Sequence, residues 1–152
     1  MSVFRVLDIA GTAMNSQSVR LNATASNLAN AESVSSSVDD TYKARRPLFS
    51  AAWEEALARN AESGEPRDPV TGEMFGVGVA LKGVVESDAP VIVEYNPNHP
   101  LADANGYIYR PNINPVEEMA DMMSAQRSYQ TAVQVADSAK KMLLQTLRLG
   151  QS

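Results

Sequence analysis

Residues 3–30 read VFRVLDIAGTAMNSQSVRLNATASNLAN. Apolar or small residues recur in this stretch at alternating spacings of three and four, at Phe4, Leu7, Gly11, Met14, Ser18, Leu21, Ala25 and Leu28. This is the spacing of a heptad stripe, so we predict a helix about 40 Å long at about 1.5 Å per residue. Arg20 is the one charged residue from Ile9 to Ala31. Because neutral amides and small residues let neighbouring backbones approach closely, we expect this helix to be packed on more than one side.

Residues 115–149 predict a second helix, roughly 50 Å long. Asn114 is a good N-cap, Pro115 suits the first helical position and Glu117 stands three residues after the cap. Gly150 is placed to stop the helix. Gln126 and Lys140 interrupt its stripe of residues spaced by about 3.5, which comprises Met119, Met122, Tyr129, Val133, Ala136, Leu143 and Leu147. Two such stripes predict an α+β protein whose long terminal helices form an antiparallel coiled-coil pair.

The middle of the chain predicts a small β-rich region. Residues 32–40 are a polar loop, 50–60 a short helix and 61–73 a loop rich in proline and glycine. Alternating apolar residues over 74–95 predict a β-hairpin that turns at Asp88-Ala89-Pro90, and Tyr107–Tyr109 adds a short strand. We therefore divide the chain into an N-terminal helix over 1–31, a middle domain over 32–114 and a C-terminal helix over 115–152.

Charge is concentrated in this middle region. Of the net charge of −5, the middle holds 13 acids against 7 bases, whereas the two helical ends are nearly neutral. An acidic chain is a poor ligand for nucleic acid, whose phosphates require a basic face. The sequence has no cysteine and one histidine, so we expect no metal, cofactor or small-molecule site. It contains no apolar run of about 18 residues and no Sec-type signal, which favours the cytosol or a non-Sec export route.

Each helix has a narrow apolar stripe. If the two helices pair only with each other, their uncharged opposite faces remain exposed to solvent. Packing of many copies side by side would bury these faces, with the terminal helices inward and the acidic middle regions outward. Two alternatives remain open. A soluble helical adaptor or export chaperone would need charged outer helix faces, and a hydrolase using Asp88 and Glu94 would need a roomy pocket. We interpret Glu117, Glu118 and Asp121 as complements of the helix dipole, and His99 as the donor or acceptor of a hydrogen bond that stabilises its turn.

Two sequence motifs carry more specific information about the class of protein. The first is Arg20-Leu21-Asn22 followed by Ala25-Ser26-Asn27-Leu28-Ala29-Asn30-Ala31. The second comprises Asn98-His99-Pro100-Leu101-Ala102-Asp103, Gly106-Tyr107, Pro111-Asn112-Ile113-Asn114, and the run from Glu117 through Tyr129. The first resembles the signature of the flagellar rod and hook (axial) proteins, and the second is similar to the proximal-rod members of that family.

The resemblance implies a non-enzymatic rod subunit of the basal body, exported by the flagellar type III apparatus without a cleaved signal. It implies polymerisation into a periplasmic helical tube that transmits torque from the ring to the hook. The implied partners are copies of the chain, other rod proteins, and the membrane-ring and export-gate base. We predict subunit contacts at Leu7, Met14, Leu21, Leu28, Met119, Met122, Tyr129, Val133 and Leu143, with polar register-setting contacts at Asn27, Asn30, Gln126 and Arg127.

Overall fold

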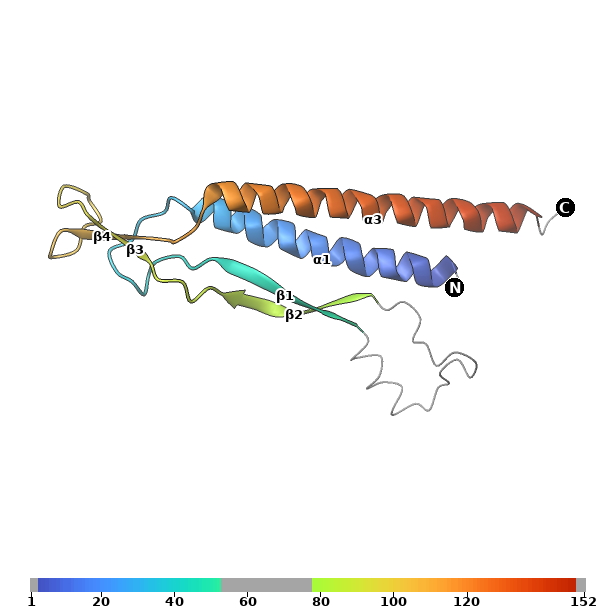
Figure 1. Ribbon diagram of the computed structural model, residues 1–152, viewed down its shortest axis with the longest axis horizontal. Helices are drawn as coiled ribbons and strands as arrows, with labels where there is room; N and C mark the ends of the chain where they lie inside the picture. The colour runs from blue at the N-terminus through green and yellow to red at the C-terminus, as the bar shows by residue number, and fades with distance from the viewer. Residues whose placement is uncertain (1–2, 53–77, 150–152) are drawn as a thin grey trace, which may run out of the picture. The chain divides into compact units, whose positions relative to one another are not determined.

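A computed structural model describes residues 3–52 and 78–149 of the chain. The described elements are helix α1 (Val3–Asn30), strands β1 (Arg45–Ala51), β2 (Val79–Glu86), β3 (Ile92–Tyr95) and β4 (Tyr107–Arg110), and helix α3 (Pro115–Leu149) (Figure 1). The two terminal helices pack together, and the strands between them form small hairpins. The predicted α+β class is therefore confirmed.

The chain divides into two compact units, and each contains parts of both helices and of the middle region. The first comprises Met1–Ser18, Phe49–Lys82 and Gln126–Ser152. The second comprises Val19–Leu48 and Gly83–Ala125. The helices consequently cross from one unit into the other.

Both helices have the predicted bounds within the described residues. Asn114 caps α3 as expected, since its Oδ1 accepts a hydrogen bond from the Val116 amide at 3.0 Å. The direction of the pair follows from two side-chain contacts in the second unit. Arg20 lies beside Asp121, and Asn27, seven residues further along α1, lies beside Glu118, three residues earlier in α3. The two helices are therefore antiparallel in this unit.

The strands pair differently from the prediction. The predicted hairpin over 74–95 is wrong, because β2 pairs with β1 and β3 pairs with β4. Strand β1 was not predicted from the sequence, because it contains two arginines and Pro47, and proline is unfavourable within a strand. Alternation of apolar residues locates strands but does not select their partners. The predicted strand at Tyr107–Tyr109 is confirmed within β4.

The predicted short helix over 50–60 is wrong at its start. Ser50 and Ala51 belong to β1, and Ala52 lies in a turn whose amide bonds the Gly78 carbonyl at 2.9 Å. The rest of that prediction, the loop predicted over 61–73 and the stop at Gly150 lie outside the described residues.

The loop between β3 and β4 is organised by Asp103. One carboxylate oxygen accepts hydrogen bonds from the amides of Asn105 and Tyr107, each at 2.8 Å, and the other accepts one from the Tyr109 hydroxyl at 3.3 Å. The Tyr107 amide, followed by the other bonds to the charged form, lowers the pKa of Asp103 below its ordinary value of 3.8. Desolvation and then the Asp103 charge raise the pKa of Tyr109 above 10.0.

Replacing Asp103 by asparagine is expected to lower the pKa of Tyr109 towards 10.0 without bringing it fully there. The substitution removes the negative charge, but desolvation, which is the larger cause, remains. In the unsubstituted chain, the contribution of Asp103 to stability is present above pH 3.8 and is lost as the pH falls through its lowered pKa. NMR titration of the side-chain carbons of both residues measures these values. An unchanged Tyr109 pKa in the variant would contradict this account.

In the first unit, Gly78 lies against α1. The Val79 amide donates to Thr12 Oγ1 at 3.3 Å, and Thr12 Oγ1 donates to the Ile9 carbonyl at 2.9 Å. A Cβ atom at Gly78 would overlap Thr12 Oγ1 and lie 2.9 Å from Thr12 Cβ. The absence of a side chain at Gly78 therefore permits this approach of chain to helix.

Replacing Gly78 by alanine is expected to lower the free energy of unfolding by about 1–3 kcal/mol, because the added methyl group overpacks the contact with Thr12. Gly11→Ala is the control with the opposite sign. An added Cβ at Gly11 has no neighbour within 4 Å, so alanine should stabilise α1 by about 0.5–1 kcal/mol. Urea unfolding followed by far-UV circular dichroism measures both changes. Equal midpoints for the two variants would disprove the packing assignment.

Candidate assembly interface

A buried side-chain junction joins both helices to the strand region in the second unit. Its centre is Asn27, which is 1% exposed and lies in the last turn of α1. The Asn27 Nδ2 group donates to the Arg45 carbonyl at 3.0 Å and to Glu118 Oε2 at 3.1 Å. Its Oδ1 accepts from the Arg45 amide at 2.8 Å and from the Tyr42 hydroxyl at 3.0 Å. Every hydrogen-bonding position of this amide is therefore filled within the chain.

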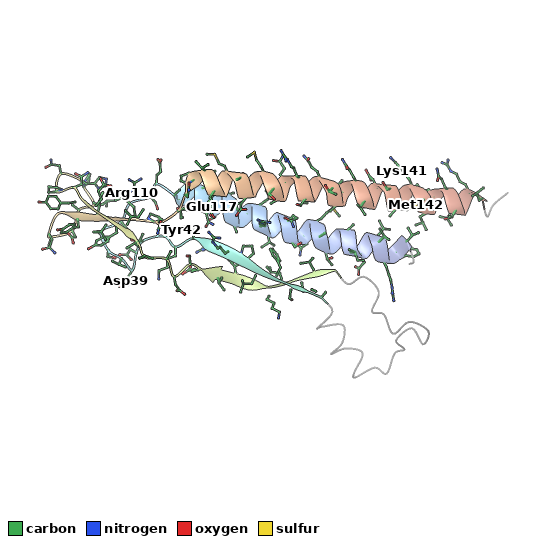
Figure 2. All side chains as sticks on the ribbon, viewed as in Figure 1. Asp39, Tyr42, Arg110, Glu117, Lys141 and Met142 are labelled. Carbon is green, nitrogen blue, oxygen red and sulfur yellow. The ribbon has the colours of Figure 1, made fainter. Side chains whose placement is uncertain are left out.

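The junction extends through Tyr42. Since the Tyr42 hydroxyl donates to Asn27, its 3.0 Å contact with Ser26 Oγ must be one in which Ser26 donates. The Arg45 guanidinium lies 5.7 Å from the centre of the Tyr42 ring, within the range of a cation–π contact. The segment before β1 is thus tied to α1 by side chains as well as by Arg45 backbone atoms. Tyr42 is labelled in Figure 2.

Three ion pairs surround this junction. Arg20 and Asp121 are 3.0 Å apart between the helices. Arg46 lies 3.9 Å from Glu117, which is labelled at the start of α3 in Figure 2. Arg45 lies 3.8 Å from Glu86 across β1 and β2. All three pairs are partly exposed, so each contributes at most about 1 kcal/mol and serves mainly to fix alignment.

The buried row of α3 consists of one glutamate and three alanines. Its members recur every seven residues at Glu118, Ala125, Ala132 and Ala139. The row predicted from sequence is displaced from it: Met122, Val133 and Leu143 are half-buried, whereas Met119, Tyr129 and Leu147 are exposed. Small side chains permit close helix approach, and larger apolar ones remain on the flanks. The predicted stripe is therefore not the row that α3 buries within the chain.

Helix α1 follows the same pattern. The residues that it buries are small or polar, namely Ala10, Ser16, Ala23, Thr24 and Asn27. Leu7, Met14, Leu21 and Leu28 of the predicted stripe are half-buried, and Phe4 is exposed. At about 100° per residue these buried positions lie within one arc of about 140°, so packing of α1 on more than one side stays a prediction.

The predicted polar contacts have different surroundings. Asn30 is half-buried and donates to the Ser26 carbonyl at 2.8 Å, whereas Gln126 and Arg127 are exposed. Asn27 is satisfied inside the chain, so the bonds that the structure gives it align segments of one subunit. The sequence did not indicate that Glu118 and Tyr42 would be its partners. The position of Glu118 in the first turn of a helix suggested only a dipole effect.

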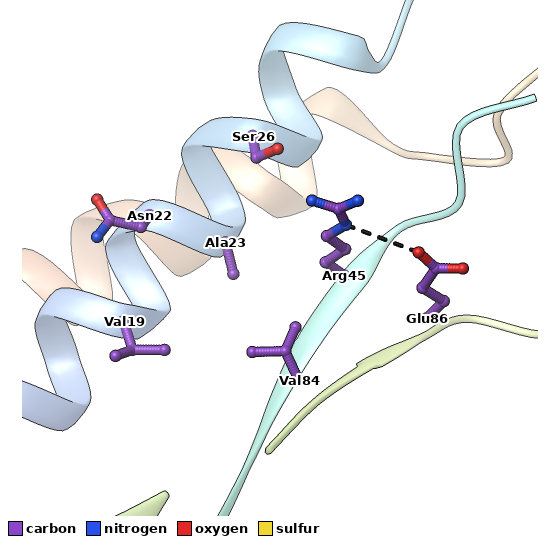
Figure 3. Close-up of a pocket in the computed structure, with 7 residues that line it drawn as sticks. All are labelled: Val19, Asn22, Ala23, Ser26, Arg45, Val84 and Glu86. Carbon is purple, nitrogen blue, oxygen red and sulfur yellow. Dashed lines mark ion pairs between the residues drawn. The ribbon is translucent and has the colours of Figure 1, made fainter.

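A pocket of about 460 Å³ lies in the second unit between α1 and the two strands β1 and β2 (Figure 3). It is lined by Val19, Asn22, Ala23, Ser26, Arg45, Val84 and Glu86. Its apolar members come from α1 and β2, and the ion pair between Arg45 and Glu86 lies at its rim (Figure 3).

The features expected of a catalytic or metal site are few. Over residues 3–52 and 78–149, no group of three or more His, Asp or Glu side chains is placed to hold a metal ion. Glu94, considered for a hydrolase, pairs with Arg110 at 3.5 Å on the exposed hairpin. His99 Nδ1 accepts a hydrogen bond from the Leu101 amide at 3.1 Å, which confirms its predicted role in the turn. Neither α1 nor α3, as far as each is described, is long and apolar enough to cross a membrane.

Comparison with known proteins identifies the family. Residues 7–34 match the family described as flagella basal body rod protein, and residues 104–149 match the C-terminal family of flagellar basal body rod FlgEFG proteins. The chain is 42% identical to flagellar basal-body rod protein FlgC of Salmonella typhimurium and 44% identical to that of Escherichia coli O157:H7. It is 29% identical to FlgC of Bacillus subtilis. Each comparison covers 99% of this chain and 100% of the relative. The chain therefore belongs to the FlgC family of flagellar basal-body rod proteins, as a structural subunit of the rod and not an enzyme.

Proposed function

We propose that this chain polymerises with copies of itself and with other rod proteins into a helical tube that carries torque from the ring to the hook. The observation that carries the proposal is the division of α3 into a buried row of alanines and flanks of exposed large apolar residues. The exposed members are Val116, Met119, Met123, Tyr129, Val135, Met142, Leu144, Leu147 and Leu149. So many apolar side chains along one helix favour burial against neighbouring subunits.

Apart from Asn27, which is buried within the chain, the residues predicted at subunit contacts divide into two groups. Met119, Gln126, Arg127 and Tyr129 are exposed and are directly available to a neighbour. The half-buried residues Leu7, Met14, Leu21, Leu28, Asn30, Met122, Val133 and Leu143 would contribute the side of the contact nearest the helix pair. Heterologous contacts whose rotation does not close a ring build a helical array.

Torque transmission requires that the middle region rotates together with the helices as one rigid part. The junction at Asn27 supports this role, because its buried bonds connect α1, the segment leading to β1 and the start of α3. Such a fully bonded polar network resists reorientation of the segments that it joins. We further propose export by the flagellar type III apparatus without a cleaved signal, and contact with the membrane-ring and export-gate base of the basal body.

Cysteine labelling tests the proposed contacts, because the chain has no cysteine of its own. Single cysteines at Met119 and Tyr129 should react with a maleimide in the free subunit and be protected in isolated basal bodies. A cysteine at Asp39, an exposed residue of the polar loop, serves as the control and should react in both (Figure 2). Equal labelling of Met119→Cys and Tyr129→Cys in free subunits and basal bodies would overturn the proposal.

A further inference from the structure

The pocket between α1 and the strands combines an apolar part with a charged rim. Val19, Ala23 and Val84 line the apolar part. At the rim, the 3.8 Å separation of Arg45 and Glu86 is long for an ion pair, and both side chains are more than half exposed. Each charge thus retains capacity for another partner. A site of this composition suits an apolar side chain that is accompanied by charge.

The last turns of α3 carry apolar side chains and one basic side chain, which complement the apolar part and the charged rim of the pocket. Helix α3 has 35 residues and α1 has 28. From the bond between Asn27 and Glu118, α1 runs about 36 Å back to Val3, whereas α3 runs about 46 Å on to Leu149, at about 1.5 Å per residue. Measured along its own axis, α3 is therefore longer than α1. It carries exposed Leu144, Leu147 and Leu149, with Arg148 between the last two.

We infer that the pocket of one subunit receives the last turns of α3 from a second copy of this chain. This inference rests on the proposed polymerisation and names one of its contacts. Leu147 would enter the apolar part beside Val84, and Arg148 would approach Glu86. The carbonyl groups at the end of a helix carry a partial negative charge, which complements Arg45. The contact thus places two pairs of opposite charges around one inserted apolar side chain, Leu147.

The two surfaces are different, so the contact is heterologous. A subunit whose pocket is filled by a neighbour still presents its own α3 end to another copy. Such a contact can repeat without closing, as an array of subunits requires. A two-fold contact through one shared patch would instead end at a dimer.

Disulfide formation between two singly substituted copies tests the contact directly. Cells would produce both Val84→Cys and Leu147→Cys chains, and isolated basal bodies would be oxidised. A dimer of this chain should form only when both variants are present, because the proposed contact places position 84 of one copy beside position 147 of another. Met123→Cys paired with Val84→Cys is the matched control, because Met123 and Leu147 lie on the same helix and are both 56% exposed. No dimer, a dimer of equal yield with the control, or a disulfide to a different protein would overturn the inference.

A charge exchange supplies the second measurement. Glu86→Arg and Arg148→Glu should each reduce swimming in soft agar, and the double variant should recover at least half of the loss. Additive losses in the double variant would contradict the pairing of these charges. Protection of Met119→Cys and Tyr129→Cys in basal bodies without the Val84–Leu147 disulfide would overturn this contact alone. Loss of that protection would instead overturn the proposed function.

Discussion

Replacing Asn27 by aspartate is expected to lower the free energy of unfolding by about 3–5 kcal/mol at neutral pH. The substitution exchanges the Nδ2 donor for an oxygen that faces Glu118 Oε2, at a distance of 3.1 Å in the unsubstituted chain. Glu118 is 4% exposed, so two carboxylates would meet with little water between them. The Arg45 carbonyl would also lose its donor. Urea unfolding followed by far-UV circular dichroism measures the change.

The loss in Asn27→Asp should become smaller as the pH falls. One proton shared between the two carboxyl groups restores a hydrogen bond and removes the repulsion. The folded variant then binds more protons than the unfolded variant, so its stability rises with decreasing pH relative to the unsubstituted chain. Asn15→Asp, at an exposed position of the same helix, should change stability by only a few tenths of a kcal/mol.

Adding Glu118→Gln to Asn27→Asp should recover part of the lost stability, because the donor and acceptor exchange places. Recovery would be partial, since the Arg45 carbonyl still faces an oxygen. Two results would show that Asn27 does not hold the junction together. One is an Asn27→Asp midpoint equal to that of Asn15→Asp, and the other is a double variant less stable than either single variant.

Replacing Met123 by aspartate is expected to abolish swimming while leaving the isolated subunit folded. Met123 is exposed in the single chain, so the substitution removes little packing within it. In an apolar contact between subunits, an unpaired carboxylate would cost several kcal/mol at every copy. Swimming in soft agar would be measured in cells whose own copy of the gene is deleted. Circular dichroism and the urea midpoint of the purified variant would establish that it folds.

Ser36→Asp is the control for this experiment. Ser36 is exposed and lies in the polar loop over 32–40, outside the proposed contact surface of α3. The same aspartate at this position should leave swimming close to normal. Normal swimming with Met123→Asp, or equal loss with both variants, would remove Met123 from the proposed contact surface.

The positions of the elements were largely predictable because the relevant signals are local. Helical periodicity, the Asn114 cap and the Pro115 start predicted both helices with the bounds observed over the described residues. Apolar alternation also located most of β2 and β3. The pairing of these strands was not predictable in the same way. Pairing depends on contacts between residues far apart in the chain, and the arginines and proline of β1 concealed the partner of β2.

The candidate site was only partly predictable. Ranking side chains by hydrophobic size selected Met119, Tyr129 and Leu147 for the helix stripe, whereas α3 buries alanines. The sequence marked Asn27 as a polar contact, but its partners Arg45 and Glu118 are 18 and 91 residues away in the chain. No local pattern connects an amide with acceptors at such separations.

The sequence by itself determined two long helices, their ends and the near absence of charge along α1, because these features depend on neighbours within one or two turns. Tertiary structure decided which row of each helix is buried, which strands pair and which groups satisfy Asn27. Those outcomes depend on how closely two backbones can approach, and small side chains allow the closest approach. Met119, Tyr129 and Leu147 of the sequence pattern are therefore left exposed on α3 within the single chain.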